Sequence, residues 1–285
     1  MMKFSEQVFE LAESFMTRPL YVIIRGDMIE ALAHQMLNNP QIPNYQQGPD
    51  PDTYKAILIE LVASSINYCY WYGCSKVRPG NASSSTMYSI VETTFDNFRF
   101  KTYEDFEECI DIIQKTLILE RFPLMEERIK HLDELKIYGQ KFASYLQSNR
   151  DFEECFTYLI TFFPGFGSDL FLKRASLFFI QLYRRYRWFA NEMQTLHVPA
   201  DYQIPKMLSH YECIEYSSIL KDKIDFNSLI PKHSITECEI RSATILVINE
   251  LCKLTGWNVS DVDGWLFSKR NESKKPFHLT ITTDY

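Results

Sequence analysis

Helical periodicity is the feature that most limits what this chain can fold into. From Thr102 onward, apolar residues recur at intervals of three and four positions, which predicts one helix after another. Residues 236–239 read as a capping box that begins a helix, and Gly256 is a good stop for it. The helices of this half are expected to begin near residues 102, 124, 151, 170, 236 and 259, with Ser260 capping the last. We therefore expect a mainly α fold with at most a few short strands.

The first hundred residues follow the same pattern. Residues 5–16 and 27–37 are expected to form short helices, and Tyr54 to Trp71 a buried one. The stretch 20–24 fits either a short strand or a buried helical turn, because periodicity does not separate the two in so short an apolar run. The other expectations are loops at 38–52 and 77–85 and a strand-like tail at 277–282.

Length and composition indicate a globular protein. The chain has 285 residues, of which 46% are hydrophobic, and this apolar content is ample for a large core. No internal repeat or clear linker interrupts it. We expect a single helical domain over residues 1–285, in which residues 1–53 supply N-terminal helices and a loop.

Charge and cysteine usage limit the partners and the compartment. The net charge is −7 and no basic stripe is visible, so a long nucleic-acid partner is not expected, whereas a small anion needs only one or two cations. The seven cysteines form no CxxC pair, which is typical of reduced thiols. Neither a signal peptide nor a membrane span is indicated, so the cytoplasm is expected. Composition leaves the oligomeric state open.

Motifs for metals, phosphate loops and serine nucleophiles are missing. The sequence contains no HExxH motif, no close histidine pair and no GxSxG elbow. A lone Gly165-Phe166-Gly167 follows a helix rather than a strand, so it carries little weight as a phosphate loop. We expect neither a metal nor a cofactor.

One acidic residue stands on a short connector between two prolines. Asp201 lies in the run His197 to Lys206, with Pro199 before it and Pro205 after it. Proline fixes its own φ and favours extended geometry in the residue before it, so Val198 and Ile204 are expected to be extended. A carboxylate on such a connector is held in a fixed orientation, which a catalytic group requires. The alternative is that Asp201 only caps the following helix, and the local sequence favours that alternative.

Three further groups could bind a ligand, and each has a structural alternative. Lys173 and Arg174 are adjacent cations. They could bind an anion, or they could be a pair of solvent-exposed charges. The segment Asn67 to Trp71 contains aromatic residues, which more often pack in a hydrophobic core than stack against a ligand. If the Asn67 amide is buried, it needs hydrogen-bond partners. Asp261 and Trp265 share a helical face and could hold a purine-like ring, or Asp261 could support the helix N-terminus.

These short motifs occur together and in the same order in one known family. The chain thereby resembles the queuosine salvage proteins, the queuosine 5′-phosphate N-glycosylase/hydrolases. The resemblance runs from about residue 55 to the C-terminus. No single motif is long, and the ordered set is more specific than any member. The matching segments are Asn67-Tyr68-Cys69-Tyr70-Trp71, Pro123-Leu124-Met125-Glu126-Glu127-Arg128, Phe163-Pro164, Lys173-Arg174-Ala175, Ala200-Asp201-Tyr202-Gln203-Ile204-Pro205, Tyr216-Ser217, Glu237-Cys238-Glu239-Ile240-Arg241, Asp261 with Trp265, and Pro276-Phe277-His278.

The resemblance implies a fold similar to DNA glycosylases and hydrolysis of the N-glycosidic bond of queuosine 5′-phosphate, which frees queuine for reinsertion into tRNA. It implies that Asp201 is catalytic, stabilising or attacking an oxocarbenium-like sugar. Queuine is a 7-deazapurine without N7, so base protonation there is excluded and Asp201 is expected to face the sugar. The residues expected to bind substrate are Tyr202, Trp71 and Trp265 as stacking rings, Asp261 and Asp263 as acceptors, Asn67 as a polar contact, and Lys173, Arg174 or His278 at the 5′-phosphate.

Three positions depart from the family pattern. Gln181 stands where an Ala-Asp-x-Trp segment carries an acid, Leu266 replaces a possible second acid after Trp265, and Asn81 to Ser85 replace a glycine- and aromatic-rich segment. The alternative function is therefore a catalytically weak or inactive helical protein that binds a nucleotide or a partner. A true DNA glycosylase is disfavoured by the acidic charge.

Overall fold

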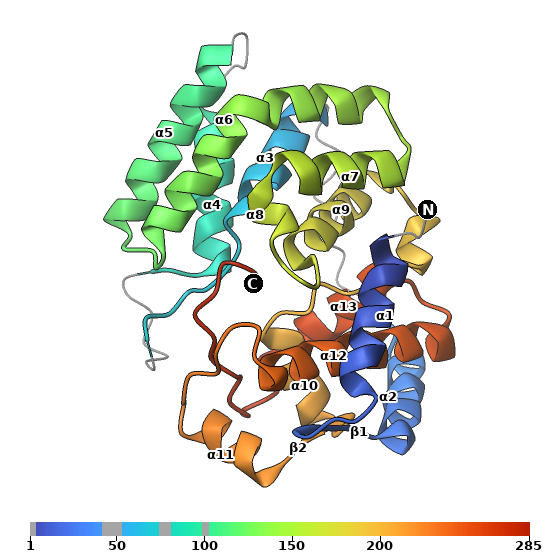
Figure 1. Cartoon of the computed structure of the whole chain (residues 1–285). Helices are drawn as coiled ribbons and strands as arrows, with labels where there is room; N and C mark the ends of the chain where they lie inside the picture. Colours follow the sequence, from blue (N-terminus) through green and yellow to red (C-terminus); the bar gives the residue numbers. More distant parts are fainter. Residues whose placement is uncertain (1–3, 42–52, 74–80, 99–102) are drawn as a thin grey trace. The chain divides into compact units, whose positions relative to one another are not determined.

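The computed structural model describes residues 4–41, 53–73, 81–98 and 103–285 (Figure 1). Thirteen α-helices, one short 3-10 helix and a two-stranded sheet make up these residues, which confirms the mainly α prediction. The similarity to DNA glycosylases stays a prediction. No helix among the described residues has both the length and the apolar character that crossing a bilayer requires. Two compact units are present, unit 1 with residues 1–45 and 189–281, and unit 2 with residues 46–188 and 282–285.

Unit 1 is arranged around the long helix α12, Ile235–Thr255, which contacts α1, α2, α10, α13 and β1. Ten consecutive residues of α12, Thr236 to Ile245, are buried, as expected of a helix that other elements cover on all sides. The other elements of unit 1 are α1 (Phe4–Met16), β1 (Val22–Ile24), α2 (Gly26–Asn38), η1 (Glu192–Gln194), α10 (Gln203–His210), β2 (Ile214–Tyr216), α11 (Ser218–Asp225) and α13 (Val259–Ser268).

The ambiguous stretch 20–24 contains a strand. β1 pairs with β2 in antiparallel register, Ile23 opposite Glu215. The buried Glu239 carboxylate on α12 accepts the backbone N–H groups of Leu20, Tyr21 and Val22, at 2.8, 2.7 and 3.1 Å. Because the carboxylate satisfies three backbone donors, the segment entering β1 is fixed to the central helix.

Unit 2 is arranged around α3, Thr53–Ser65, which contacts α4, α6 and α9. Residues 56–65 of α3 are all buried. The other helices of unit 2 are α4 (Ser84–Asp96), α5 (Tyr103–Leu119), α6 (Met125–Ser148), α7 (Phe152–Phe162), α8 (Pro164–Gly167) and α9 (Lys173–Tyr186). In Figure 1, α5 and α6 lie side by side as an antiparallel pair, and the two helices are in contact.

Several sequence predictions about element ends are wrong. The predicted helix from Tyr54 to Trp71 ends at Ser65, and Cys69 takes a positive φ of 29°. Helix α4 was not predicted; it begins after Ser83, whose side chain accepts the Thr86 N–H. Residues 77–80 of the predicted loop 77–85 and residues 42–52 of the predicted loop 38–52 lie outside the described residues, whereas Ser84 and Ser85 belong to α4.

Helix caps and the tail also differ from the prediction. The caps of α12 and α13 are Ser234 and Asn258, each before the residue that the sequence suggested. Residues 277–282 form no strand, because only Leu279 makes a bridge, a parallel one to Leu229. A single bridge leaves the alternating tail without a partner strand along its length.

Candidate active site

The sequence-predicted site residues fall into two groups. Unit 1 holds Asp201, Tyr202, Asp261, Asp263, Trp265 and His278, whereas unit 2 holds Asn67, Trp71, Lys173 and Arg174. In each unit, the predicted residues gather on an irregular segment and on the elements that fix it.

In unit 1, the connector is the irregular stretch 197–202, which is buried except for the half-buried Asp201. One oxygen of that carboxylate, Oδ1, accepts the N–H groups of Gln203 and Ile204 at 2.7 and 3.2 Å. Asp201 therefore caps α10, as the structural alternative required. Ile204 is helical rather than extended, and Pro205 lies in the first turn of α10, where a missing N–H removes no helical hydrogen bond.

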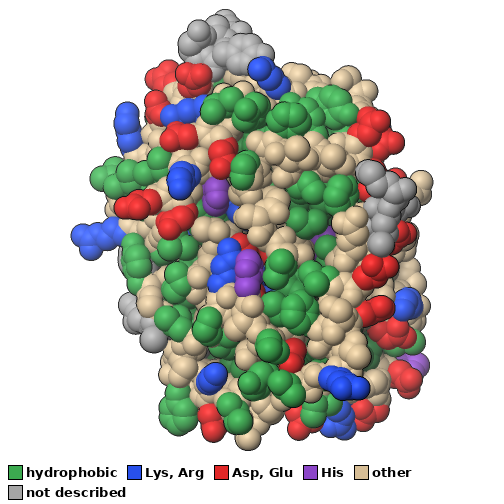
Figure 2. Space-filling view, viewed as in Figure 1, with side chains coloured by type: hydrophobic (Ala, Val, Ile, Leu, Met, Phe, Trp, Pro, Cys, Tyr) green, Lys and Arg blue, Asp and Glu red, His purple; other side chains and the backbone are tan. Residues whose placement is uncertain are grey.

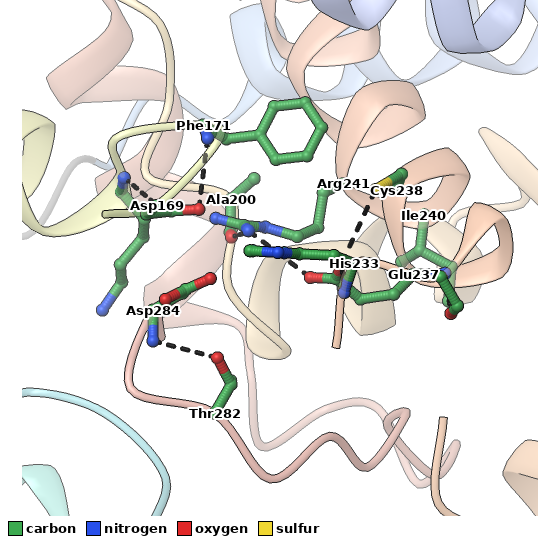
Figure 3. Close-up of polar contacts among 12 residues, drawn as sticks. Asp169, Phe171, Ala200, His233, Glu237, Cys238, Ile240, Arg241, Thr282 and Asp284 are labelled. Atoms are coloured by element: carbon green, nitrogen blue, oxygen red, sulfur yellow. Dashed lines mark hydrogen bonds and ion pairs between the residues drawn. The ribbon is translucent and has the colours of Figure 1, made fainter. Parts of the chain in front are cut away.

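A fully buried arginine on α12 holds the connector from the other side. Arg241 Nε donates to the Ala200 carbonyl at 3.1 Å (Figure 3). Its NH1 donates to Glu237 Oε1 at 3.4 Å, and both side chains are completely buried. Glu237 Oε2 in turn accepts the His233 N–H at 3.0 Å. The residue before Asp201 is thus attached to a buried ion pair.

The motif Pro276-Phe277-His278 packs against the same connector. The Tyr202 and Phe277 rings lie 4.8 Å apart between centroids, tilted by 42°. Burial and, to a smaller extent, the Arg241 charge lower the pKa of His278 to about 3. His278 is therefore neutral at neutral pH. A neutral ring offers one N–H donor, so the predicted phosphate contact of His278 would be a hydrogen bond rather than an ion pair.

Helix α13 places the remaining predicted residues of unit 1. Asp261 is half-buried in the first turn, where its Oδ2 accepts from Asn258 Nδ2 at 2.8 Å and its N–H donates to Asn258 Oδ1 at 3.1 Å. Asp263 is buried. Trp265 is fully buried, and its Nε1 donates to the Asn39 carbonyl at 2.9 Å. The reciprocal Asn258–Asp261 bonds confirm that Asp261 supports the helix N-terminus.

Unit 1 also contains a cavity of about 440 Å³ that none of the predicted residues lines. Its lining includes three cations and three acids in equal number, which gives no preference for an anion. The charged residues at this cavity are Arg25, Lys221, Lys275, Glu212, Glu215 and Asp225.

In unit 2, the segment after α3 is held by cations through its backbone carbonyls. The fully buried Arg128 donates to Ile66 O, to Tyr68 O at 2.5 Å and to Cys69 O at 2.8 Å. Its Nε donates to the Pro123 carbonyl at 2.8 Å. The C-terminal carbonyls of a helix have no helical partner, and a nearby positive charge stabilises them.

Lys173 and Arg174 complete this arrangement. Lys173 Nζ donates to the Asn67 carbonyl at 3.1 Å, and Arg174 donates to the carbonyls of Ser65 and Gly165. Both side chains are buried, and burial lowers the pKa of Arg174. The five consecutive carbonyls from Ser65 to Cys69 thus each accept from a buried cation. The alternative of a solvated cation pair at 173–174 is wrong.

The aromatic residues of the same segment pack among these cations. The guanidinium carbons of Arg128 and Arg174 lie 4.3 and 5.0 Å from the centre of the Tyr68 ring. Asn67 Oδ1 accepts from the Tyr70 hydroxyl at 2.8 Å, which provides the amide partner that the sequence required. Trp71 is buried.

Gln181, the residue that departs from the family acid, joins a separate buried network in unit 2. Its Nε2 donates to the Tyr88 hydroxyl at 3.3 Å, and that hydroxyl donates to Glu60 at 3.4 Å. Glu60 accepts from Arg185 Nε at 2.5 Å, and Arg185 also pairs with Glu92 at 3.2 Å. The amide at 181 is therefore satisfied within a network that ties α9 to α3 and α4.

Sequence reasoning assigned no role to Arg128 or Arg241, although both lie in matched segments. For Arg241 a signal was present, because Ile240, Ala243 and Ile245 lie around it and a guanidinium with five donors cannot be buried there without partners. Arg128 follows Glu126 and Glu127 and precedes Lys130, so its surroundings in the sequence predict an exposed side chain. What the sequence does not reveal is which carbonyls accept from them. Within each unit taken by itself, the described residues include no group of three His, Cys, Asp or Glu side chains close enough to bind a metal ion.

Comparison with known proteins identifies one family over most of the chain. The family described as "Queuosine salvage protein" matches residues 49–282. A protein of Dictyostelium discoideum named queuosine 5′-phosphate N-glycosylase/hydrolase is 23% identical over 260 residues, 79% of this chain and 77% of its own. Proteins of the same name from Schizosaccharomyces pombe and Sphaerobacter thermophilus are 24% and 26% identical, over 68% and 57% of this chain and 59% and 58% of their own lengths.

Proposed function

Since this chain belongs to the queuosine salvage protein family, we propose that it hydrolyses the N-glycosidic bond of queuosine 5′-phosphate. Water adds to the anomeric carbon, the C–N bond breaks, and queuine and ribose 5-phosphate leave. The proposal rests on the relatives' shared name and on one observation about the site. That observation is the Asp201 carboxylate, which is fixed at a half-buried position on a connector that is otherwise buried.

Asp201 acts on the sugar rather than on the base. N-glycoside cleavage develops positive charge at the anomeric carbon, and a carboxylate held beside it stabilises that charge or attacks it. Hydrogen bonds from Gln203 N and Ile204 N fix Oδ1, so the plane of the carboxylate and the direction of Oδ2 are fixed as well. Fixed electrostatic groups of this kind are worth about 3–4 kcal/mol each. The capping role thus provides the rigidity that catalysis requires.

Base contacts are proposed for the remaining predicted residues. A guanine-like edge offers N–H donors to carboxylates, and the ammonium and diol of the queuine side chain do the same. Asp261 and Asp263 are the proposed acceptors, and an aromatic ring is the natural platform for the base. The residues proposed for stacking and polar contact are Tyr202, Trp71, Trp265 and Asn67.

Among the three candidates for the 5′-phosphate, Lys173 is preferred. His278 is neutral, and both terminal nitrogens of Arg174 donate to backbone carbonyls. A lysine ammonium is a compact point charge of the kind that binds phosphate, and Lys173 Nζ donates to the Asn67 carbonyl at 3.1 Å. Lys173 is therefore proposed to meet the phosphate, while Arg174 supports the segment beside it.

The substrate is proposed to be a small nucleotide rather than a polynucleotide. On the face in Figure 2, cationic and acidic side chains are interspersed, without a continuous basic band. A protein that binds a long phosphate backbone usually presents such a band. We also place the protein in the cytoplasm, because the six cysteines among the described residues are all free thiols.

Chromatography of queuosine 5′-phosphate after incubation with the pure protein tests the proposal. The expected products are queuine and ribose 5-phosphate in equal amounts. Tight binding without turnover would contradict it and favour the inactive binding protein. Gln181 does not favour that alternative, because its amide belongs to the buried network of Tyr88 and Glu60.

A further inference from the structure

The connector that carries Asp201 is fixed at two adjacent points. On the C-terminal side, the Asp201 carboxylate binds the first N–H groups of α10. On the N-terminal side, the Ala200 carbonyl accepts from Arg241 Nε at 3.1 Å. That carbonyl belongs to the peptide group whose nitrogen is that of Asp201. Its orientation therefore sets the position of the Asp201 Cα.

Arg241 is itself held by a second buried group. Glu237 Oε1 accepts from NH1, one helical turn before Arg241 on α12, and both residues have no exposed surface. Glu237 Oε2 accepts the His233 N–H at 3.0 Å, so the carboxylate is anchored as well (Figure 3). A planar guanidinium with bonds at Nε and NH1 is restrained in orientation, which a lysine cannot reproduce.

The burial of this pair requires a reason beyond stability. Replacing a buried ion pair by well-packed apolar residues is often neutral or stabilising, so burial alone does not explain why charge is placed here. Within this pair, Arg241 Nε donates to the carbonyl of Ala200, the residue next to Asp201. The neighbouring His278 is neutral, so it adds no positive charge that would compete for Glu237.

We propose that Arg241 and Glu237 are positioning residues that act through Asp201. Arg241 fixes the peptide before Asp201, Glu237 fixes Arg241, and the carboxylate is thereby aimed at the anomeric carbon. This inference rests on the proposed function for its effect on rate, and on the contacts alone for its effect on the connector.

Kinetics of two conservative variants test the effect on rate. Arg241→Lys keeps the positive charge but removes the planar guanidinium, of which two nitrogens bind Ala200 and Glu237. Glu237→Gln keeps the size of the side chain and removes its negative charge. We expect kcat for queuine release to fall about 30-fold in Arg241→Lys and about fivefold in Glu237→Gln, since a misplacement of about 1 Å costs up to about 100-fold. KM should stay within about twofold. Arg185→Lys, which alters the buried Glu60 pair of unit 2, is the matched control and should leave kcat unchanged.

A double-mutant cycle distinguishes a positioning role of Arg241 from a general disturbance of the fold. If Arg241 acts through Asp201, then Arg241→Lys should change the residual rate of Asp201→Asn by less than about twofold. An equal fold loss in both backgrounds, or a loss that appears only in KM, would overturn the proposal.

Hydrogen exchange tests the same contacts without relying on activity. In Arg241→Lys and in Glu237→Gln, the amides of Gln203 and Ile204 should exchange at least about tenfold faster, while α9 of unit 2 is unchanged. Unchanged exchange in the connector would overturn the positioning role even in an active enzyme. If the wild-type protein released no queuine, the proposed function would fail, and faster exchange would still support the structural part of this inference.

Discussion

The connector that carries Asp201 and the segment from Ser65 to Cys69 are both largely irregular and largely buried, and arginines donate to backbone carbonyls of both, but the arginine charge is balanced differently. Arg241 in unit 1 pairs with Glu237 and donates to the Ala200 carbonyl. Arg128 in unit 2 has no carboxylate within ion-pair distance among the described residues, and it donates to four carbonyls.

This difference separates two uses of a buried cation. Carbonyl dipoles and aromatic faces surround Arg128, so its removal leaves several acceptors unsatisfied and threatens the fold. Arg241 has a carboxylate partner in Glu237, and its Nε donates to the carbonyl of the residue next to Asp201. We therefore expect Arg128 to matter mainly for stability and Arg241 mainly for rate.

The largest effect is expected at Arg128. Arg128→Met should lower the free energy of unfolding by about 3–5 kcal/mol, because buried carbonyls at the end of α3 lose their donors. Urea unfolding followed by circular dichroism measures it. Lys141→Met, an exposed cation on the same helix α6, should stay within about 0.5 kcal/mol. Similar losses of unfolding free energy in the two variants would contradict the structural role of Arg128.

A smaller loss of stability is expected at Arg241. Arg241→Lys keeps a positive charge near Glu237 and should cost about 1–2 kcal/mol, mainly through the lost hydrogen bond to Ala200. Denaturant unfolding of this variant beside Arg128→Met tests the comparison directly. A loss at Arg241 as large as that at Arg128 would show that the two arginines serve the same purpose.

Lys173 tests whether the cations of unit 2 also meet substrate. Lys173→Met should raise KM for queuosine 5′-phosphate about tenfold, equivalent to about 1.4 kcal/mol of binding, and leave KM for the nucleoside queuosine unchanged. Steady-state release of queuine from both substrates provides the comparison. An equal rise for both substrates would mean that Lys173 only supports the Asn67 carbonyl.

The last prediction concerns a pH dependence of stability at His278. Its folded pKa of about 3 lies below the unfolded value near 6.5, so the unfolded chain binds a proton that the folded protein does not. The stability of the folded state should therefore fall as the pH drops below about 6.5, by up to about 1.4 kcal/mol per pH unit from this residue. The slope of unfolding free energy between pH 6 and 4 should be shallower in His278→Gln. Identical slopes would contradict the burial of a neutral ring.

Much of this fold could be predicted from the sequence, and the failures share a cause. Helices α1, α6, α12 and α13 follow from apolar periodicity, which reports burial along one face. The end of α3 was misplaced because residues 66–71 stay buried and aromatic after the helix stops. Backbone carbonyls that bind cations, rather than a change in hydrophobicity, mark that boundary.

The sequence singles out the residues of the candidate site, which stay a prediction, but it does not indicate their contacts. Asp201 stood out through its flanking prolines, and its capping bond to α10 was foreseen as an alternative. The partners of Arg241 and Arg128 could not be predicted, because every residue has a backbone carbonyl and the sequence does not indicate which carbonyl accepts a hydrogen bond. For the same reason, the sequence did not distinguish Lys173 from Arg174, which donate to carbonyls two residues apart.

The central claim is that a carboxylate which caps α10 also drives cleavage of the glycosidic bond. Asp201→Asn tests it most directly, because an asparagine oxygen still accepts the N–H groups of Gln203 and Ile204 and preserves the cap. Single-turnover release of queuine from queuosine 5′-phosphate, with thermal unfolding as the control for folding, is the measurement. We predict a rate at least about 100-fold below wild type with an unchanged melting temperature. A folded Asp201→Asn protein that releases queuine at close to the wild-type rate would contradict the account.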